Sequence, residues 1–199
     1  MRKEGTVSSI YKRIFTGLLA VALLLSCYPL LRWGMDSYYR AAYPYEYKEY
    51  IRTYSAENNL PEALVCAVVY TESTFRPDAV SPVGARGLMQ LMEESFDWTR
   101  NKLGEGEEVT YDTMFDPETN IRYGSKMLSL LLEEFGSVET ALCAYHAGWG
   151  NVKNWLKNPD YSSDGRTVDV IPYDDTRYYV NKVKQTAQIY EKLYDLSGR

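Results

Sequence analysis

The sequence places one carboxyl group, that of Glu72, where its ionisation should be shifted. A helix is predicted after Pro61, and Val65, Val68 and Val69 form an apolar stripe along it. Glu72 is the next position on that stripe, so its carboxyl group should be partly desolvated, which disfavours the anion and raises the pKa. A carboxylic acid that stays protonated near neutral pH is what a glycosidic oxygen needs in order to leave. An exposed glutamate at a helix end fits the same spacing.

The sequence gives little support for a metal site or a disulfide framework. The chain has one histidine, His146, and three cysteines, Cys27, Cys66 and Cys143. Without a Cys-x-x-Cys pair or a second histidine we expect no zinc site, and nothing suggests an organic cofactor. An odd number of widely spaced cysteines is not a disulfide framework. We interpret Cys66 and Cys143 as free buried thiols, with a bond between them as the alternative.

An uncharged apolar run extends from Ile14 to Leu31. At about 1.5 Å of rise per residue, a helix over this run is about long enough to cross the hydrocarbon core of a bilayer. The residues before the run are mainly basic: Arg2, Lys3, Lys12 and Arg13. The positive-inside rule therefore predicts a cytoplasmic segment at 1–13, a single-pass transmembrane anchor at 14–31, a stalk at 32–45 and an extracytoplasmic domain at 46–199.

Two other interpretations of this run also export the domain. One is a cleaved signal peptide. The other is a lipoprotein modified at Cys27, because the residues from Leu24 to Cys27 resemble a lipobox. A buried core helix is a further alternative, which the basic flank disfavours.

The remainder of the chain has the periodicity of helices. Asp116 followed by Pro117 is typical of a helix start, and Gly136 of a helix end. No segment alternates over the length of a strand, and the net charge of -5 argues against a nucleic-acid partner. We therefore predict an all-α or nearly all-α domain, with helices beginning near residue 47 and at about 62–74, 93–102, 116–135, 137–147, 152–156 and 174–194.

Five motifs carry a resemblance to a known family. They are E-S-x-F at 72–75, A-x-S-x-x-G-A-x-G-L-M-Q-L-M at 79–92, D-P-x-x-N-I-x-x-G at 116–124, A-L-x-A-Y-H-A-G at 141–148 and I-P-Y-x-x-T-R-x-Y-V at 171–180. In order and spacing, over roughly residues 45–190, the sequence resembles the lytic transglycosylases of the soluble-lytic-transglycosylase type. The resemblance implies a lysozyme-like helical fold of the goose type.

The resemblance also implies a reaction. Members cut the β-1,4 bond between N-acetylmuramic acid and N-acetylglucosamine in peptidoglycan and leave 1,6-anhydro ends. They use one glutamate as general acid and then base, and here that residue is Glu72. Substrate contacts are expected from eight further residues: Ser73, Ser81, Gln90, Met92, Tyr145, His146, Gly148 and Tyr179. The Tyr145 hydroxyl is expected to face the catalytic carboxyl group.

Several residues depart from the family pattern or have a structural explanation. His146 stands where members usually carry asparagine, and this exchange adds a group that titrates near neutral pH. Asp169 and Asp175 stand where glutamates are usual. Gly124 lies on the apolar stripe of its helix, and we interpret it as a point where another helix comes close. Gly87 is expected to let the loop turn tightly and approach a sugar.

Two other functions fit the same fold. One is a muramidase, which would admit water and leave reducing ends. The other is a wall-binding domain without turnover, which the presence of Glu72, Gln90 and Tyr145 disfavours. The expected partners are peptidoglycan glycan strands and, through residues 14–31, the cytoplasmic membrane.

Overall fold

The structure is a computed structural model that describes the backbone of residues 4–196. It describes the side chains of the same residues except those at 4–12, 14, 20 and 22–24. The chain divides after Tyr43 into two compact units, and each is described by itself.

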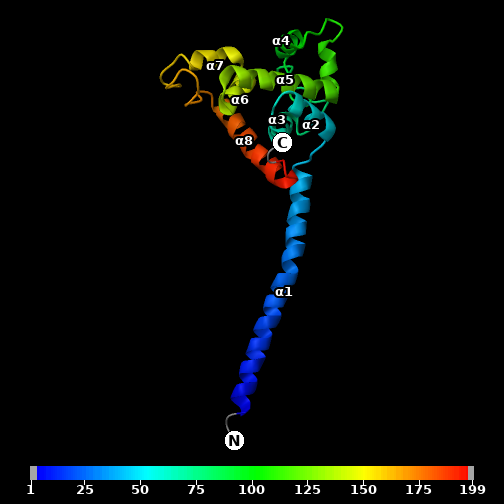
Figure 1. Cartoon of the computed structure of the whole chain (residues 1–199), viewed down its shortest axis with the longest axis vertical. Helices are drawn as coiled ribbons and strands as arrows, with labels where there is room; N and C mark the ends of the chain where they lie inside the picture. The colour runs from blue at the N-terminus through cyan, green and yellow to red at the C-terminus, as the bar shows by residue number, and fades with distance from the viewer. Residues whose placement is uncertain (1–3, 197–199) are drawn as a thin grey trace. The chain divides into compact units, whose positions relative to one another are not determined.

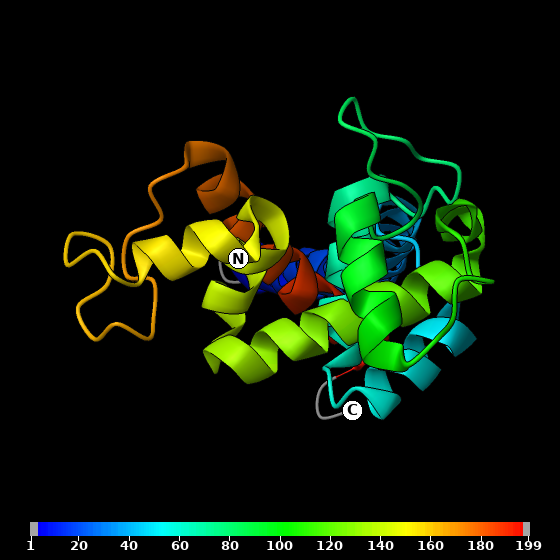
Figure 2. The same ribbon diagram turned by 90° about the horizontal axis from the view of Figure 1, so that it is seen from above.

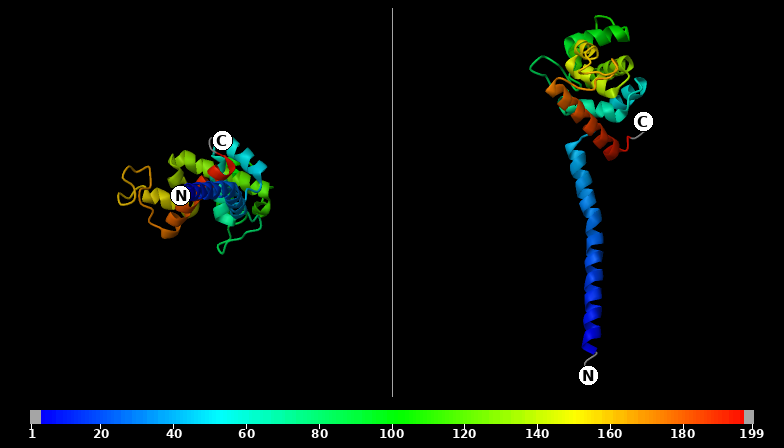
Figure 3. Two further views of the ribbon diagram at one scale, coloured as in Figure 1. Left: turned by 90° about the horizontal axis from the view of Figure 1, so that it is seen from below. Right: turned by 90° about the vertical axis from the view of Figure 1, so that its left-hand side faces the viewer.

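The first unit is one long helix, α1 (Glu4–Ala42), which is continuous through Pro29 (Figures 1 and 3). The large apolar side chains described along it are exposed, among them Phe15, Leu25 and Trp33. In the described part of the chain, no helix combines the length and the apolarity that a membrane crossing requires. The transmembrane segment predicted at 14–31 is therefore not supported here, and its side chains at 14, 20 and 22–24 lie outside the described residues. The predicted stalk is helical as far as Ala42.

The second unit is built from helices, and the residues described contain isolated β-bridges but no strand. Its elements are α2 (Lys48–Glu57), α3 (Glu62–Ser73), α4 (Glu93–Leu103), the 3₁₀ helix η1 (Tyr111–Phe115), α5 (Pro117–Phe135), α6 (Val138–Ala147), α7 (Trp149–Trp155) and α8 (Asp174–Tyr194). The nearly all-α domain expected from the sequence is thus confirmed.

Helix α3 forms the centre of this unit. Every residue from Ala63 to Val69 is buried, so the helix is enclosed on all sides except at its last turns. It packs chiefly against α8, while α5 packs against α6 and α2. Burial of this apolar helix supplies the driving force that fixes its position, and its C-terminal turn carries Glu72 to the edge of the core.

The ends of α5 and α6 follow from capping residues in the sequence. The Asp116 carboxylate accepts from the Thr119 backbone N–H, Pro117 occupies the first turn, and Gly136 ends α5 in a left-handed conformation. The structure corrects the start of α7, which begins at Trp149 rather than near residue 152. Gly148, at φ 91°, both ends α6 and begins α7, so no linker separates the two helices.

Candidate active site

Glu72 lies half-buried in the last turn of α3. Burial raises the pKa of its carboxyl group to about 7, although a hydrogen bond from Tyr179 and the positive charge of Lys182 both lower it. Among the described residues, no carboxylate contributes to this shift of the Glu72 pKa. The raised pKa expected from the apolar stripe is confirmed, and at neutral pH the protonated and ionised forms are both well populated.

Two tyrosines lie close to this carboxyl group. Burial and the negative charge of Glu72 raise the phenol pKa of Tyr145, on α6, and that of Tyr179, on α8, well above their usual value. Both hydroxyls therefore stay protonated as possible donors. The Tyr145 hydroxyl, however, donates to the Met89 carbonyl oxygen at 2.8 Å. Among the residues that the structure describes, the buried Tyr179 hydroxyl has no partner other than the Glu72 carboxyl group, so its one proton is available to the carboxylate.

His146 packs against the second of these tyrosines. Its ring stacks on that of Tyr179 with the centroids 4.5 Å apart, and its Nδ1 lies 3.1 Å from the Thr176 hydroxyl oxygen. Desolvation lowers the pKa of His146, while the Asp175 carboxylate raises it. The net shift is downward, so the imidazole is mostly neutral at pH 7. The Tyr179 side chain thus lies between His146, on which its ring stacks, and Glu72, to which its hydroxyl donates.

The loop between α3 and α4 carries several of the predicted binding residues. Its carbonyl groups at 87, 88, 89 and 91 accept from the side chains of Gln90, Ser73, Tyr145 and Tyr111, at 2.9, 2.8, 2.8 and 2.8 Å. Three side chains from other parts of the chain, together with the segment's own Gln90, therefore fix one short segment. A rigid segment of this kind can present ligand-binding groups without first paying an ordering cost.

Asn120, on α5, is the residue that connects this loop to the core. Its buried amide nitrogen donates to the carbonyl oxygens of Met114 and Arg86 at 2.8 and 3.1 Å. Its amide oxygen accepts from the Met89 backbone N–H at 2.7 Å. Asn120 was not among the site residues expected from the sequence. Its place in the D-P-x-x-N-I motif was the available signal, but its role depends on α5 passing next to the loop.

The structure gives Ser73 and Ser81 a different role from the predicted contact with substrate. Ser73 is buried and donates to the Leu88 carbonyl oxygen at 2.8 Å, so it ties α3 to the loop. The Ser81 hydroxyl accepts from the Ala85 backbone N–H at 3.0 Å and closes a turn. The Gln90 amide nitrogen is also used within the loop, which leaves its carbonyl oxygen for a ligand. The hydroxyl groups of both serines thus serve the loop, and their contact with substrate stays a prediction.

Met92 and Gly148 lie at the surface on two sides of this region. Met92 is 40% exposed and stands immediately before α4. Gly148 is exposed, and a Cβ added there would meet no atom within 4 Å. An apolar side chain and an open glycine at the rim leave room for a ligand to approach.

The two glycines interpreted from the sequence make close approaches, but to other partners than expected. A Cβ on Gly124 would lie 2.3 Å from the Met89 sulfur, so the neighbour is a loop side chain and not another helix. A Cβ on Gly87 would lie 2.1 Å from the Met114 carbonyl oxygen and 2.2 Å from the Asn120 amide. Both glycines therefore serve the packing of the loop on α5.

The two cysteines of this unit are free thiols. Cys66 on α3 and Cys143 on α6 are both buried and unbonded, which settles the alternatives in favour of free thiols. Burial raises the pKa of each, so neither is poised as a nucleophile.

Comparisons with known proteins agree with this arrangement. The family model described as "Transglycosylase SLT domain" matches residues 49–166. The soluble lytic murein transglycosylase of Escherichia coli strain K12 is 33% identical over 143 residues, which are 71% of this chain and 22% of that protein. Membrane-bound lytic murein transglycosylase C of Pectobacterium atrosepticum is 29% identical over 174 residues, which are 74% of this chain and 47% of that protein.

A solved structure extends the likeness to the fold. An inactive glutamate-to-glutamine mutant of the lytic transglycosylase Slt from Pseudomonas aeruginosa matches with a TM-score of 0.69 at 30% identity, covering 79% of this chain and 26% of that one. The helical, lysozyme-like fold is therefore shared with that protein. The chain spans less than half the length of each of these relatives.

Proposed function

The chain belongs to the transglycosylase SLT family, and from this membership we propose that it is a peptidoglycan lytic transglycosylase. It cuts the β-1,4 bond between N-acetylmuramic acid and N-acetylglucosamine and leaves a 1,6-anhydromuramic end. Residues 46–199 form the catalytic domain. The observation that supports this most is the Glu72 carboxyl group, half-buried, with a pKa of about 7 and two tyrosines beside it.

Glu72 acts first as an acid. Its proton passes to the oxygen that bridges the two sugars, and the bond from that oxygen to C1 of the muramic residue breaks. The 2-acetamido group of the same sugar stabilises the positive charge at C1, in the manner of the substrate-assisted glycosidases. A carboxyl group with a pKa near 7 is protonated often enough to donate at neutral pH and basic enough to recover the proton.

Glu72 then acts as a base. Its carboxylate takes the proton of the muramic C6 hydroxyl as that oxygen bonds to C1, so no water enters the product. The Tyr179 hydroxyl and Lys182 stabilise the carboxylate between the two steps, because both favour the ionised form. One carboxyl group is enough, because the 2-acetamido group of the substrate stabilises the positive charge at C1 that a second carboxylate would otherwise stabilise.

The sugar contacts that we propose come from both sides of Glu72. Met92 and the Gln90 carbonyl oxygen lie on the loop side, and Tyr179, His146 and Gly148 lie on the side of α6 and α8. Tyr145 helps to position the loop, because its hydroxyl donates to the Met89 carbonyl oxygen. Ser73 and Ser81 hold the loop.

The N-terminal segment is proposed to anchor the enzyme. Residues 14–31 cross the cytoplasmic membrane once, with residues 1–13 inside and the catalytic domain on the extracytoplasmic side. The uncharged run, its basic flank and the exposed apolar side chains of α1 support this proposal. Extraction of cell membranes with alkaline carbonate, combined with N-terminal sequencing, tests it: a retained anchor resists extraction and keeps residue 1, a signal peptide is removed, and a lipoprotein begins at Cys27.

Product analysis tests the reaction. Purified peptidoglycan is digested with the enzyme, and the fragments are identified by mass spectrometry. We expect 1,6-anhydromuramic ends, which are lighter than reducing ends by one water. Reducing ends alone would identify a muramidase of the same fold instead, and undigested walls would favour a binding domain.

A further inference from the structure

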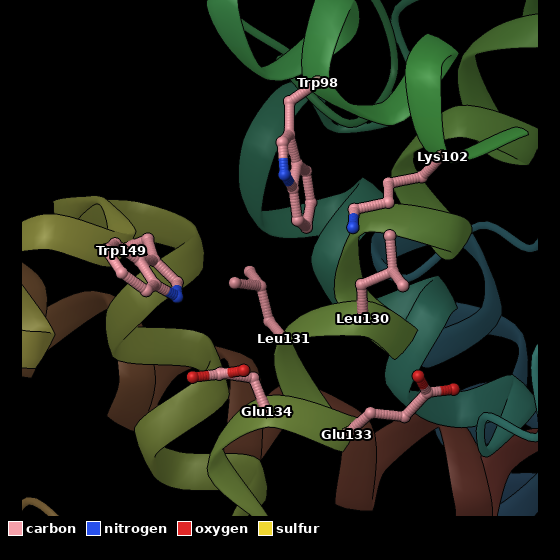
Figure 4. Close-up of a pocket in the computed structure, with 7 residues that line it drawn as sticks. All are labelled: Trp98, Lys102, Leu130, Leu131, Glu133, Glu134 and Trp149. Atoms are coloured by element: carbon pink, nitrogen blue, oxygen red, sulfur yellow. The ribbon is translucent and has the colours of Figure 1, made fainter.

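A groove lies on the second unit between α4 and α7, with α5 as its floor (Figure 4). Figure 2 shows these helices from above. Trp98 on α4 and Trp149 on α7 form its two walls, and Leu130 and Leu131 form the floor. Figure 4 shows the two indole rings on either side of Leu131. The volume is about 250 Å³, just below the range of about 300–1,000 Å³ usual for drug-sized ligands, so it suits one unit of a chain.

The two tryptophans expose a large aromatic surface. Trp98 is 37% exposed and Trp149 is 52% exposed. Leaving two such rings in water on one small surface is unfavourable, and grouped exposed apolar side chains commonly mark a binding site. A flat indole ring can pack against the C–H face of a sugar ring while its N–H remains a donor.

One of these walls is already held in place. The Lys153 ammonium group lies 5.1 Å from the centre of the Trp149 ring and 5.2 Å from that of the Phe135 ring. The same ammonium group forms an ion pair with the Glu134 carboxylate. Trp149 is therefore oriented before any ligand binds, which reduces the entropy cost of binding.

The polar groups around the floor are both donors and acceptors. The Lys102 ammonium group stands beside the Trp98 ring, and the carboxylates of Glu133 and Glu134 stand at the opposite edge (Figure 4). Hydroxyl and acetamido groups can bond to either kind. Because Glu134 is paired with Lys153, the charges around the groove balance, and they offer no basic surface to a polyanion such as a nucleic acid. The lining thus fits a neutral, polar ring compound.

The two walls of the groove adjoin, along the chain, two residues of the candidate active site. Helix α4, which carries Trp98, begins directly after Met92, and Trp149 directly follows Gly148. Trp98 lies six positions after Met92 along the helix, a rise of about 9 Å, which is close to the length of two linked sugar rings. A strand that passes Met92 and Gly148 therefore enters the space between the two tryptophans.

We propose that this groove is an outer sugar-binding subsite, where Trp98 and Trp149 clamp a ring of the same glycan strand that is cut at Glu72. The inference rests on the proposed function, because that function supplies the strand. The subsite makes the enzyme favour long strands over short ones. Neither the acid step nor the base step uses Trp98 or Trp149. Loss of binding at the subsite can therefore be distinguished from loss of catalysis at Glu72.

Calorimetric titration of the full chain in detergent tests this subsite. The protein carries Glu72→Gln so that the ligand stays intact, and the ligands are β-1,4-linked oligomers of N-acetylglucosamine with three and with six rings. We expect the hexamer to bind more tightly than the trimer. Trp98→Ala and Trp149→Ala should each remove about tenfold of that advantage, the loss usual for a central aromatic contact. Tyr50→Ala, an exposed aromatic of α2 outside the groove, is the matched control.

Three results would overturn the inference. In the first, the tryptophan variants keep the full advantage of the hexamer. In the second, the hexamer has no advantage with any form of the protein. In the third, the variants lose affinity only for wall strands that still carry peptide stems, and not for strands stripped by an amidase, in which case the groove binds peptide. If the chain leaves walls undigested and binds neither oligomer, the proposed function fails as well.

Discussion

The imidazole ring of His146 stacks on the phenol ring of Tyr179, with the centroids 4.5 Å apart, and the Tyr179 hydroxyl acts on the Glu72 carboxyl group. A titrating ring is thereby coupled to the acid through one intervening side chain. An asparagine at this position would not titrate. This chain therefore has a source of pH dependence next to its acid.

His146→Asn should remove part of the acid-side loss of activity. As the pH falls below the lowered pKa of His146, the imidazole becomes charged, and a positive charge near Glu72 favours the carboxylate over the acid. The wild-type pH–rate profile should then carry an additional inflection on the acid side that the profile of the variant lacks. Rates of peptidoglycan digestion from pH 4.5 to 8 check this, and parallel profiles for the two proteins would contradict the coupling.

Tyr179→Phe and Tyr145→Phe should have different effects on the Glu72 pKa. The Tyr179 hydroxyl lowers that pKa, so its removal should move the corresponding ionisation in the pH–rate profile upward. The Tyr145 hydroxyl is bonded to the Met89 carbonyl oxygen, and its removal should cost about 1 kcal/mol of stability with less change in the profile. Equal shifts of the two profiles would contradict this division of roles.

Glu72→Gln should stabilise the protein in a pH-dependent way. The folded pKa of about 7 is higher than the value of about 4.3 for an unfolded chain, so the folded state binds more protons between these values and unfolding becomes easier as the pH rises. The variant should therefore gain on the order of 2 kcal/mol at pH 8, with allowance for residual exposure, and almost nothing at pH 4. Thermal unfolding at the two pH values measures this. A gain that is the same at both would contradict the raised pKa.

Asn120→Ala should loosen the loop that carries Gln90 and Met92. The change leaves the buried Met89 N–H and the buried Met114 carbonyl group without their partner, at about 1–3 kcal/mol for each group that stays unsatisfied, while the Arg86 carbonyl oxygen still accepts from the Leu91 N–H. Both the melting temperature and the rate of wall digestion should fall. Lys126→Ala on the same helix is the control. A melting temperature equal to that of the control would show that Asn120 does not hold the loop.

The elements that the sequence predicted best are those with local chemical signals. Asp116, Pro117 and Gly136 fixed the bounds of α5 because capping depends on residues a few positions apart. The raised pKa of Glu72 followed from helical periodicity in α3. The start of α7 was wrong because Gly148 joins two helices with no linker, and no run of polar residues marks that junction.

The parts that the sequence predicted poorly depend on contacts between distant segments. The bond from the Ser73 hydroxyl to the loop forms because the Leu88 carbonyl group, 15 positions later in the chain, points back to α3. The role of Asn120 requires α5 to lie beside Met89. The groove between Trp98 and Trp149 brings together α4 and α7, which are separated by the whole of α5 and α6.

The most direct test of the central claim compares the digestion rates of purified peptidoglycan by the wild-type chain and by Glu72→Gln. Glu94→Gln, an exposed glutamate at the start of α4, is the matched control and should digest walls at the wild-type rate. If Glu72 transfers the proton, its variant should be slower by about 10²–10⁴-fold, the usual contribution of a positioned general acid and base. A Glu72→Gln protein that is folded and digests walls as fast as the wild type would contradict the account.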